Sequence, residues 1–413
     1  MSGLYRLATG LLEPLVLGAA AIIEPADDTL RRDRRGELTP APGGTWCHAA
    51  SAGEMRGLVP LARSVAAVEP LVVTAQTAAG LAAARALLAD RPAHRMPFDL
   101  PGVMRRAFDR TRVAAVILAE TELWPNLLEE AERNRIPVAL VNARISNRSW
   151  PRYHLSRIFW RKGLRRLRAV AAQSETDAER FRLLGVPPEA LAVTGNMKHD
   201  LRHEVVVPAE HPWGNAPIVV LGSVRPGEEA VLAGVMSSLR ATVPGFKLVV
   251  APRHREADDP IERAFRAAGF SVSRRSRGGP LVSDDALLLD TMGELNRFYA
   301  VARVAFVGGT VRDYGGHNVA EPALVGTPVV FGPHCDNCRL EADALRQSGA
   351  GSRAGTAEEL LGAFKRQMEL DRGEAADRCR RAWSALAGAT ERTIQFLARR
   401  DVPGFRRGFR ADA

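Results

Sequence analysis

Cysteine is scarce in this sequence: its 413 residues include four, Cys47, Cys335, Cys338 and Cys379. They form no disulfide framework, and a chain of this length does not need one, so we expect a reducing compartment. Cys335 and Cys338 have the spacing C-x-x-C, but no second pair and no histidine set accompanies them. The spacing alone is therefore only a weak indication of a zinc or redox site.

Acidic residues are outnumbered and aromatic residues are few. Lysine and arginine total 57 against 47 aspartates and glutamates, which gives a formal charge of +10. Such an excess favours an anionic partner: a phosphorylated lipid surface, a nucleotide or a nucleic acid. Aromatic residues make up 6% of the chain and no RNA-binding signature interleaves them with basic residues, so no nucleic-acid partner is expected.

A long apolar run without interruption is also missing. Residues 4–23 have about the length of a spanning helix, but polar residues and a proline interrupt them at Arg6, Glu13 and Pro14. No small-residue cleavage site clearly follows, which argues against a signal peptide. Four arginines come next and suit an anionic cytoplasmic leaflet: Arg31, Arg32, Arg34 and Arg35. We expect residues 1–36 to be a membrane-associated helix and basic segment; a full span and a helix packed on its own domain stay open.

Beyond residue 44, short apolar runs alternate with helical stretches. Segments rich in alanine and arginine, such as Ala78–Leu88 and Leu127–Asn134, separate the runs. This alternation predicts a parallel sheet with helices on both faces. The runs in the first half of the chain are Leu71–Thr74, Val113–Leu118, Val138–Val141, Ala169–Ala172 and Leu191–Thr194.

A second series follows the polar, proline-containing stretch 200–217. Its apolar runs are Ile218–Leu221, Lys247–Ala251, Ala286–Leu289, Val304–Val307 and Pro328–Phe331. The sequence thus predicts two doubly wound α/β domains facing a cleft, which is the GT-B architecture. We place an N-terminal Rossmann-like domain at 37–203, a linker at 204–217, a nucleotide-binding domain at 218–390, and a C-terminal helix with a basic tail at 391–413.

In open α/β sheets, ligands bind beyond the carboxyl ends of the strands. In the first domain, polar residues follow predicted strands, and Glu54 is placed where a carboxylate could act as a base. Candidates for contacts to a sugar or an acceptor are Ser51, Gly53, Glu122, Arg144 and Lys198. Each has an ordinary explanation when taken singly: a carboxylate stabilised by the helix dipole, a helix cap or a solvated surface charge.

The second domain carries the features of a phosphate site. Glycines and helix starts follow its strands at Gly222–Glu229, Phe306–Thr310 and Gly315–Pro322, where free backbone amides can bind phosphate. Glu321 lies about one turn into the last of these helices, and a carboxylate there suits the two hydroxyls of a ribose. The segment Thr291–Leu295 could wrap a base or a ribose.

The order of these blocks resembles one family, the 3-deoxy-D-manno-octulosonic acid (Kdo) transferases. That family's blocks read roughly H-A-x-S-x-G-E, E-T-E-L-W-P, N-A-R-x-S, Q-S-x-x-D, G-N-x-K, S-T-H-x-G-E-E, P-R-H, M-G-E-L, F-V-G-G-S, G-G-H-N-x-x-E-P and G-P-H-x-x-N. Matches run in the same order from His48 to Asn337, across most of both domains. The chain departs from the pattern at Ser223-Val224-Arg225, where the family has S-T-H, and at Thr310, Ala320 and Cys338.

The resemblance implies roles for the matching residues. Glu54 would be the general base that deprotonates the acceptor hydroxyl for inverting attack on the anomeric carbon of the sugar. Lys198, Glu122 and Arg144 would contact the donor sugar or the acceptor. The cytidine monophosphate (CMP) part of the donor would be held by Arg253, Met292, Gly293, Glu294, Asn318 and Glu321, with Ser223, Arg225, Gly316 and His317 near the phosphate.

The implied function is transfer of Kdo from CMP-Kdo to a lipid A precursor, lipid IVA, in lipopolysaccharide core biosynthesis. The implied partners are CMP-Kdo, that lipid and the anionic membrane surface, at the cytoplasmic face of the bacterial inner membrane. Helix-end amides and basic side chains can stabilise the leaving CMP, so neither a metal nor another cofactor is expected.

Two alternatives stay open. A transferase of the same family could use a different CMP-activated acidic sugar or another acceptor, and the changed Ser223-Val224-Arg225 loop supports this. A basic protein that binds membranes or nucleic acids would explain the charge, but it would leave Glu54 and the glycine-rich strand ends unexplained.

Overall fold

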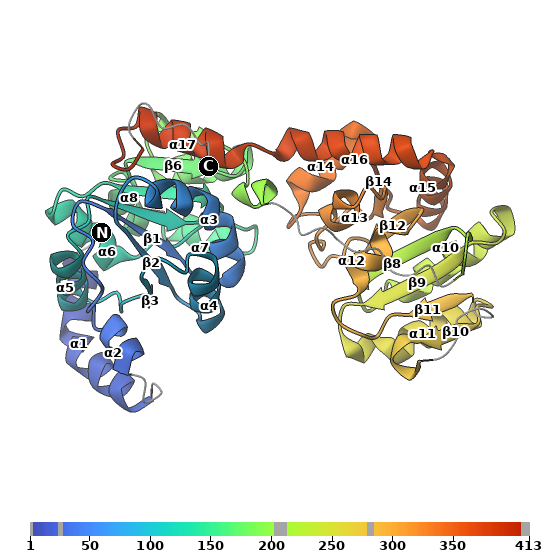
Figure 1. Cartoon of the computed structure of the whole chain (residues 1–413), viewed down its shortest axis with the longest axis horizontal. Helices are drawn as coiled ribbons and strands as arrows, with labels where there is room; N and C mark the ends of the chain where they lie inside the picture. Colours follow the sequence, from blue (N-terminus) through green and yellow to red (C-terminus); the bar gives the residue numbers. More distant parts are fainter. Residues whose placement is uncertain (1–2, 24–27, 202–212, 279–284, 406–413) are drawn as a thin grey trace. The chain divides into compact units, whose positions relative to one another are not determined.

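The computed structural model describes residues 3–23, 28–201, 213–278 and 285–405. The chain divides into two compact units, the first made of Met1–Leu201 and Ala387–Ala413 and the second of Arg202–Leu386. Each unit has a sheet with helices packed around it (Figure 1). Most of the predicted linker 204–217 and the basic tail beyond residue 405 lie outside the described residues.

Seven parallel strands form the sheet of the first unit, in the order β3-β2-β1-β4-β5-β6-β7. They are β1 (Thr45–Ala49), β2 (Leu71–Ala75), β3 (Ala93–Arg95), β4 (Ala115–Ala119), β5 (Val138–Ala143), β6 (Ala169–Ala172) and β7 (Leu191–Val193). β1 pairs with β2 on one side and with β4 on the other, so the strand order reverses between β1 and β4. Ligands of doubly wound sheets bind outside the carboxyl ends of strands at such a reversal.

Helices cover both faces of this sheet. Alternate residues of β4 show it: Ala115, Ile117 and Ala119 belong to one apolar core, Val116 and Leu118 to another. A strand buried on both faces has to be apolar throughout, which is why the central strands read as uninterrupted hydrophobic runs. The helices are α1 (Gly3–Ile23), α2 (Asp28–Arg34), α3 (Ala52–Ala66), α4 (Ala78–Leu87), α5 (Pro101–Thr111), α6 (Pro125–Arg133), α7 (Trp150–Leu155), α8 (Arg157–Leu164) and α9 (Glu175–Leu184), with short 3₁₀ turns η1 (Pro188–Ala190) and η2 (Met197–Asp200).

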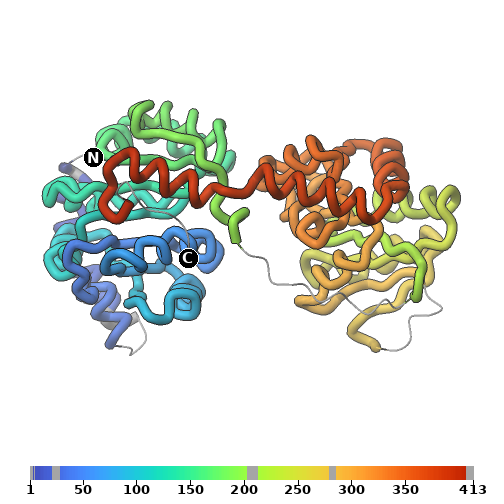
Figure 2. The backbone as a smooth tube through the Cα atoms, turned by 45° about the horizontal axis from the view of Figure 1, so that its top comes forward, coloured from blue at the N-terminus to red at the C-terminus, as the bar shows by residue number. Residues whose placement is uncertain are grey.

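The chain returns to the first unit at its C-terminal end (Figure 2). Helix α17 (Ala389–Arg399) places Ile394 and Leu397 in the core that also holds the buried face of α3. Asp200 in η2 accepts hydrogen bonds from the backbone N–H groups of Gly388 and Thr390 at the start of α17. The predicted domain division set residues 391–413 apart and did not assign them to either domain.

The second unit has the same construction, with the strand order β10-β11-β9-β8-β12-β13-β14 and a reversal between β8 and β12. Its strands are β8 (Ile218–Val224), β9 (Lys247–Pro252), β10 (Val272–Arg274), β11 (Ala286–Leu288), β12 (Val304–Val307), β13 (Val329–Phe331) and β14 (Gly351–Arg353). Its helices are α10 (Glu229–Thr242), α11 (Asp258–Ala267), α12 (Leu295–Tyr299), α13 (Ala320–Leu324), α14 (Arg339–Ser348), α15 (Ala357–Glu369) and α16 (Arg372–Leu386), with 3₁₀ turns η3 (Arg255–Ala257) and η4 (Arg275–Arg277). Two doubly wound parallel sheets confirm the predicted α/β class.

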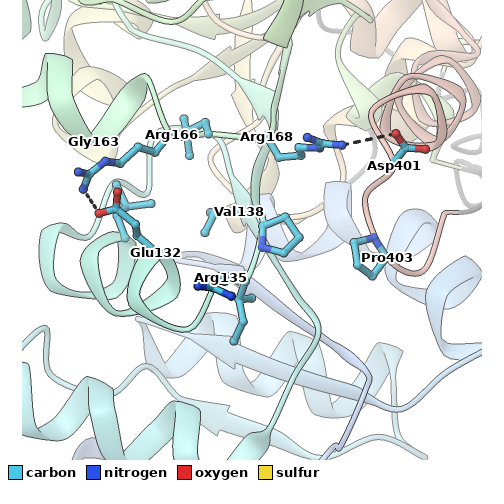
Figure 3. A pocket seen from close by; sticks show the side chains of 12 residues that line it. Glu132, Arg135, Val138, Gly163, Arg166, Arg168, Asp401 and Pro403 are labelled. Carbon is cyan, nitrogen blue, oxygen red and sulfur yellow. Dashed lines mark hydrogen bonds and ion pairs between the residues drawn. The ribbon is translucent and has the colours of Figure 1, made fainter.

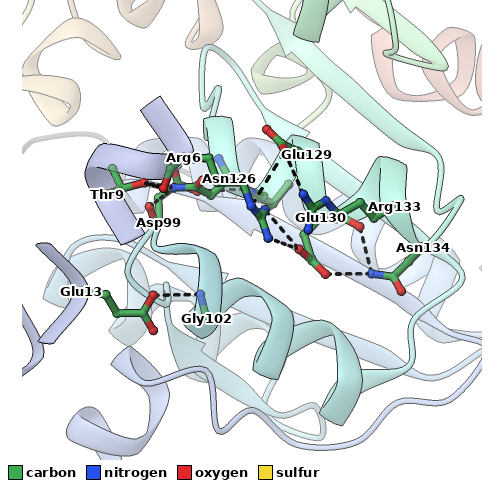
Figure 4. A network of polar contacts seen from close by, with 11 residues as sticks. Arg6, Thr9, Glu13, Asp99, Gly102, Asn126, Glu129, Glu130, Arg133 and Asn134 are labelled. Carbon is green, nitrogen blue, oxygen red and sulfur yellow. Dashed lines mark hydrogen bonds and ion pairs between the residues drawn. The ribbon is translucent and has the colours of Figure 1, made fainter. Parts of the chain in front are cut away.

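Helix α1 attaches to the first unit through its polar side chains (Figure 4). Arg6 contacts the Glu130 carboxylate at 3.4 Å, and Glu13 accepts a hydrogen bond of 2.9 Å from the backbone N–H of Gly102. Its leucines point elsewhere: Leu11 is 73% exposed and Leu15 is 70% exposed. Within the described ranges, no helix combines the length and the apolar character that crossing a membrane requires.

One arginine of the predicted basic segment is buried in the first unit and does not face solvent. Arg34 in α2 is buried, donates hydrogen bonds to Gln76 and to the backbone carbonyl of Met96, and stacks over the Phe98 ring at 4.9 Å. Its guanidinium is therefore not available to a lipid surface, and the prediction was wrong for this arginine.

Candidate active site

Glu54 lies at the carboxyl end of β1, in the first turn of α3. The Ser51 hydroxyl caps this helix: it accepts a hydrogen bond from the backbone N–H of Glu54 and donates one of 2.9 Å to the Glu54 carboxylate. The other carboxylate oxygen accepts a hydrogen bond of 2.9 Å from the backbone N–H of Ala50. A Cβ added at Gly53 would meet no atom within 4 Å, so the chain is open to a ligand beside the cap.

The surroundings of Glu54 favour its protonated form. Burial raises the pKa of Glu54 above its ordinary value of 4.5, and the negative charges of Glu120 and Glu122 raise it further. The hydrogen bonds from Ala50 and Ser51 lower that pKa but do not reverse the shift. A carboxylate whose pKa is shifted towards neutrality is a stronger base, as general base catalysis requires.

Lys198 joins this cluster from η2, far along the sequence. Its ammonium group pairs with Glu120 at 2.6 Å. Its aliphatic chain lies across α3, because a Cβ added at Gly57 would meet Cγ of Lys198 at 3.0 Å. The side chain of Asn142, at the end of β5, accepts a hydrogen bond of 3.0 Å from the backbone N–H of Met197 and so fixes η2.

Glu122 and Arg144 also lie at this edge of the sheet. The Glu122 carboxylate contacts Nε2 of the buried His48 at 3.4 Å, and Nδ1 of His48 lies 2.9 Å from the Thr74 hydroxyl. The backbone carbonyl of Arg144 accepts a hydrogen bond from the hydroxyl of Thr121. The structure therefore brings together the first-domain residues named from the sequence, and it adds Glu120 and His48, which stood in the matching blocks but were not named as site residues.

In the second unit, a buried carboxylate organises the loops at the switch between β8 and β12. Glu228 is fully buried and accepts hydrogen bonds from five backbone N–H groups: Arg225, Gly309, Thr310, Val311 and Arg312. It fixes the loop after β8 against the loop after β12. Sequence reasoning missed this role, although Glu228 stands in the matching G-E-E block.

Arg225 and His317 converge on these two loops. A Cβ added at Gly309 would lie 3.1 Å from Nε2 of His317 and 3.5 Å from Cγ of Arg225. Nε of Arg225 and Nε2 of His317 are both buried without a hydrogen-bond partner among the described residues. Buried polar groups are normally satisfied, so these two nitrogens are available to a polar ligand.

The same cluster is strongly positive. Burial lowers the pKa of His317 to about 4, and the neighbouring charges of Arg253, Arg225 and His254 lower it further. His317 is therefore neutral at physiological pH. Two arginines whose charges reach His317, together with its neutral imidazole, fit a phosphate group, which accepts several hydrogen bonds.

Ser223, Gly316, Asn318 and Glu321 adjoin this cluster. Ser223 adopts φ = +55° at the end of β8, where Gly308 of the loop after β12 lies directly against the Ser223 backbone. Gly222 instead leaves room for the Tyr299 hydroxyl. The Asn318 amide donates a hydrogen bond of 3.3 Å to Glu321 at the start of α13. Burial raises the pKa of Glu321, while this hydrogen bond and the charge of Arg253 lower it.

The segment with Met292, Gly293 and Glu294 is separate from these contacts. Glu294 pairs with Arg275 at 2.9 Å and accepts a hydrogen bond from the Thr291 hydroxyl, while Met292 is 84% exposed. Among the described residues, no hydrogen bond or ion pair joins this turn to Arg225 or His317.

A cavity of about 390 Å³ lies elsewhere in the first unit (Figure 3). Pro137 and Val138 line it at the amino end of β5, where Arg168 contacts Asp401 at 3.4 Å. Glu54 lies at the carboxyl ends of the strands, so this cavity at their amino ends is not part of the candidate site. Within the described ranges, no group of three or more His, Cys, Asp or Glu side chains could hold a metal ion.

Comparison with known proteins places this geometry in a family. Residues 28–201 match the family model described as 3-deoxy-D-manno-octulosonic-acid transferase (kdotransferase). A 3-deoxy-D-manno-octulosonic acid transferase of Bordetella pertussis is 35% identical, over 96% of this chain and 98% of that protein. One of Haemophilus influenzae is 32% identical over 72% of each chain.

A solved glycosyltransferase of Rickettsia africae shares the fold, with a TM-score of 0.57 at 11% identity over 87% of this chain and 98% of that one. Together with the two doubly wound sheets, this confirms the predicted GT-B architecture. The sequence matches are long and similar enough to assign the family as well as the fold. The chain is a glycosyltransferase and belongs to the 3-deoxy-D-manno-octulosonic acid (Kdo) transferase family.

Proposed function

We propose that this protein transfers Kdo from CMP-Kdo to a hydroxyl group of a lipid A precursor such as lipid IVA, with inversion at the anomeric carbon. The oxygen of the acceptor hydroxyl attacks the anomeric carbon while Glu54 takes the proton of that hydroxyl. The bond between the anomeric carbon and the phosphate oxygen of CMP breaks in the same step. The observation that carries the proposal is the carboxylate of Glu54, which is oriented by Ser51 and Ala50 and has a raised pKa.

The second unit supplies the donor site in this proposal. Arg225 and His317 contact the CMP phosphate and satisfy their unpaired nitrogens, while Asn318 and Glu321 hold the ribose. Arg253 adds positive charge where the leaving phosphate gains negative charge. Met292, Gly293 and Glu294 bind the cytosine end, at a distance from the phosphate contacts.

The first unit positions the acidic sugar and the acceptor. Lys198 and Arg144 provide positive charge at the sheet edge for the Kdo carboxylate or an acceptor phosphate. Glu122 and Ser51 provide oxygen atoms for sugar hydroxyls, and Gly53 leaves room beside them.

The exposed side of α1 supports attachment to the cytoplasmic face of the inner membrane. Tyr5 of α1 contacts Phe159 of α8, with the ring centroids 5.8 Å apart. Two further apolar side chains are more than four-fifths exposed: Ile158, which precedes Phe159 in α8, and Leu155 at the end of α7. Ile158 also borders a groove lined by four basic residues, Arg161, Lys162, Arg165 and Arg166. Apolar side chains beside basic ones suit the boundary between acyl chains and anionic headgroups.

Sedimentation with anionic phospholipid vesicles tests this attachment. We expect Leu11→Ser with Leu15→Ser to reduce vesicle binding and leave CMP binding unchanged, because both residues contact solvent. Leu183→Ser, at a leucine that is 44% exposed on α9, is the control and should bind vesicles like the wild type. Equal binding by all three proteins would contradict a membrane role for α1.

The reaction is tested with purified protein, CMP-Kdo generated in situ and a tetra-acylated lipid A precursor, followed by mass spectrometry of the lipid. A product heavier by one or more Kdo units is expected. CMP binding without a product would favour the second candidate, a different CMP-activated acidic sugar or acceptor. The observation in favour of that candidate is Arg225, which replaces the family's histidine and stacks over the Tyr314 ring at 4.3 Å.

A further inference from the structure

The proposed transfer makes no use of the thiols of Cys335 and Cys338. Cys335 is partly exposed, whereas Cys338 is buried and forms the N-cap of α14. The backbone N–H of Cys338 donates a hydrogen bond of 3.1 Å to the carbonyl of Cys335, which closes a four-residue turn. The end Cα atoms of such a turn lie within about 7 Å, and a disulfide needs a Cα separation of about 4.4–6.8 Å. The turn thus holds the two cysteines at a distance that a disulfide can bridge.

The two thiols also differ in the way that an attacking and a resolving thiol differ. The Cys335 thiol donates a hydrogen bond of 3.4 Å to the Gly332 carbonyl. Interaction with the Cys338 thiol lowers the pKa of Cys335 in spite of its burial, and the charge of Arg353 contributes. The same interaction, together with burial, raises the pKa of Cys338. An accessible, more acidic thiol next to a buried partner is the arrangement found in reversible dithiol sites.

This turn lies directly against the loop that contains His317 and Asn318. A Cβ added at Gly316 would meet Sγ of Cys338 at 3.0 Å and Cα of Cys335 at 3.3 Å, so no free space separates the two segments. The backbone N–H of Val319, at the end of the loop, also lowers the pKa of the Cys338 thiol. Movement of Sγ of Cys338 is therefore transmitted to the loop.

We propose that Cys335 and Cys338 form a reversible disulfide that weakens nucleotide binding by displacing the adjoining loop 315–319. The proposal rests on the proposed function, because it takes His317 and Asn318 as contacts of the donor. The Kdo transferase pattern has an aromatic residue where this chain has Cys338, so the device is a property of this chain and not of the general pattern.

The oxidant is a small-molecule or protein disulfide, R–S–S–R. The thiolate of Cys335 attacks one of its sulfurs and releases R–S⁻, which leaves a mixed disulfide on Cys335. The Cys338 thiol then loses its proton and attacks Sγ of Cys335, which releases the second R–S⁻. Two cysteine thiols are oxidised to one disulfide, and one R–S–S–R is reduced to two R–SH.

Oxidation changes the contacts beneath the loop. A disulfide brings the two sulfurs to about 2.05 Å, far closer than two thiols that are not bonded to each other. Closing this bond changes the position of at least one sulfur, and Sγ of Cys338 is the atom that packs against Gly316. The loop then loses the support that places His317 near Arg225.

The test equilibrates the full chain in glutathione buffers of increasing oxidised fraction. Free thiols are then alkylated, the Cys335–Cys338 peptide is identified by mass spectrometry, and CMP affinity is measured by calorimetry. We expect an intramolecular disulfide, CMP affinity reduced by about fivefold or more, as is usual for coupled sites, and full recovery on reduction. Cys335→Ala should bind CMP equally in all buffers, whereas Cys379→Ala, at a buried cysteine of α16, should respond like the wild type.

Either of two results would overturn the proposal: no intramolecular disulfide in the most oxidising buffer, or a disulfide that leaves CMP affinity unchanged. If the reduced protein fails to bind CMP, the coupling is overturned together with the proposed donor site. The mass spectrum is independent of CMP, so it separates a failure of the dithiol from a failure of the proposed function.

Discussion

Two helices, one in each unit, begin with a hydroxyl N-cap followed three residues later by a glutamate, but the glutamate is partly buried in one helix and exposed in the other. α3 is capped by Ser51 with Glu54 three residues later, and α15 is capped by Thr356 with Glu359 three residues later. In both, the cap hydroxyl accepts a hydrogen bond from the backbone N–H of the glutamate, and the glutamate accepts one from the backbone N–H at or next to the cap. The local structure at the two helix starts is thus nearly the same.

The pKa values of the two glutamates shift in opposite directions. Backbone hydrogen bonds lower the pKa of Glu359, which is exposed to solvent. Burial raises the pKa of Glu54, with help from Glu120 and Glu122, in spite of similar hydrogen bonds. The capping pattern therefore makes a helix start, and the environment beyond it decides whether its glutamate can serve as a base.

The two glutamates should differ most in the loss of turnover that follows when each carboxylate is replaced by an amide. We expect Glu54→Gln to reduce the turnover of Kdo transfer by about 10²–10⁴-fold, the usual contribution of a general base. Glu359→Gln, the matched control, should retain near-wild-type turnover. Initial rates with saturating donor and lipid acceptor measure both variants. Near-wild-type turnover of Glu54→Gln would show that Glu54 is not the general base. The family assignment would not change.

Loss of each cap should separate stability from catalysis. Ser51→Ala and Thr356→Ala each remove an N-cap, which costs about 1 kcal/mol of stability in the unit concerned. Only Ser51→Ala also removes a hydrogen bond that orients the Glu54 carboxylate, so we expect its turnover to fall about tenfold, as for the loss of one positioning hydrogen bond. Thermal unfolding and transfer rates on the same samples provide the comparison. A parallel fall in turnover for Thr356→Ala would show that destabilisation alone explains the effect.

Sequence patterns predicted most of the central strands of both sheets because these strands are buried on both faces and hence apolar. The central strand β1, which contains the polar residues Thr45 and His48, was not among the predicted runs. The edge strands β3, β10 and β14 were not predicted, because polar side chains such as His94 and Arg353 disrupt their apolar pattern. The sequence could not rank Glu54 above an ordinary capping glutamate without the family resemblance. The pKa of Glu54 is raised by burial and further by the charge of Glu120, which lies 66 residues away in the chain. The burial of Arg34 and of Glu228 likewise depends on packing between distant segments.

The opposite pKa shifts predict opposite effects of pH. Since the pKa of Glu54 is raised in the folded protein, its contribution to stability is present below about pH 4.5 and is lost as the pH rises through the folded-state pKa. The pKa of Glu359 is lowered, so its contribution is present above about pH 4.5 and is lost as the pH falls through the folded-state pKa. NMR titration of ¹³C-labelled glutamate carboxyls, assigned with the two glutamine variants, should find the two pKa values on opposite sides of 4.5. Titration of both groups below 4.5 would contradict the desolvation of Glu54.

The smallest expected effect is a change in the pKa of Glu54 when a neighbouring charge is removed. Glu120→Gln removes a negative charge that raises the pKa of Glu54, so that pKa should fall, by less than the loss of burial would lower it. Lys198 then loses its ion pair, and its ammonium group becomes a nearby positive charge that favours the ionised form of Glu54 as well. Both changes act in the same direction, so the acid limb of the pH–rate profile should move to lower pH. Glu374→Gln, which removes the partner of Arg378 on α16, is the control and should leave the profile in place. An acid limb unmoved by Glu120→Gln would mean that the charge of Glu120 does not contribute to the raised pKa of Glu54.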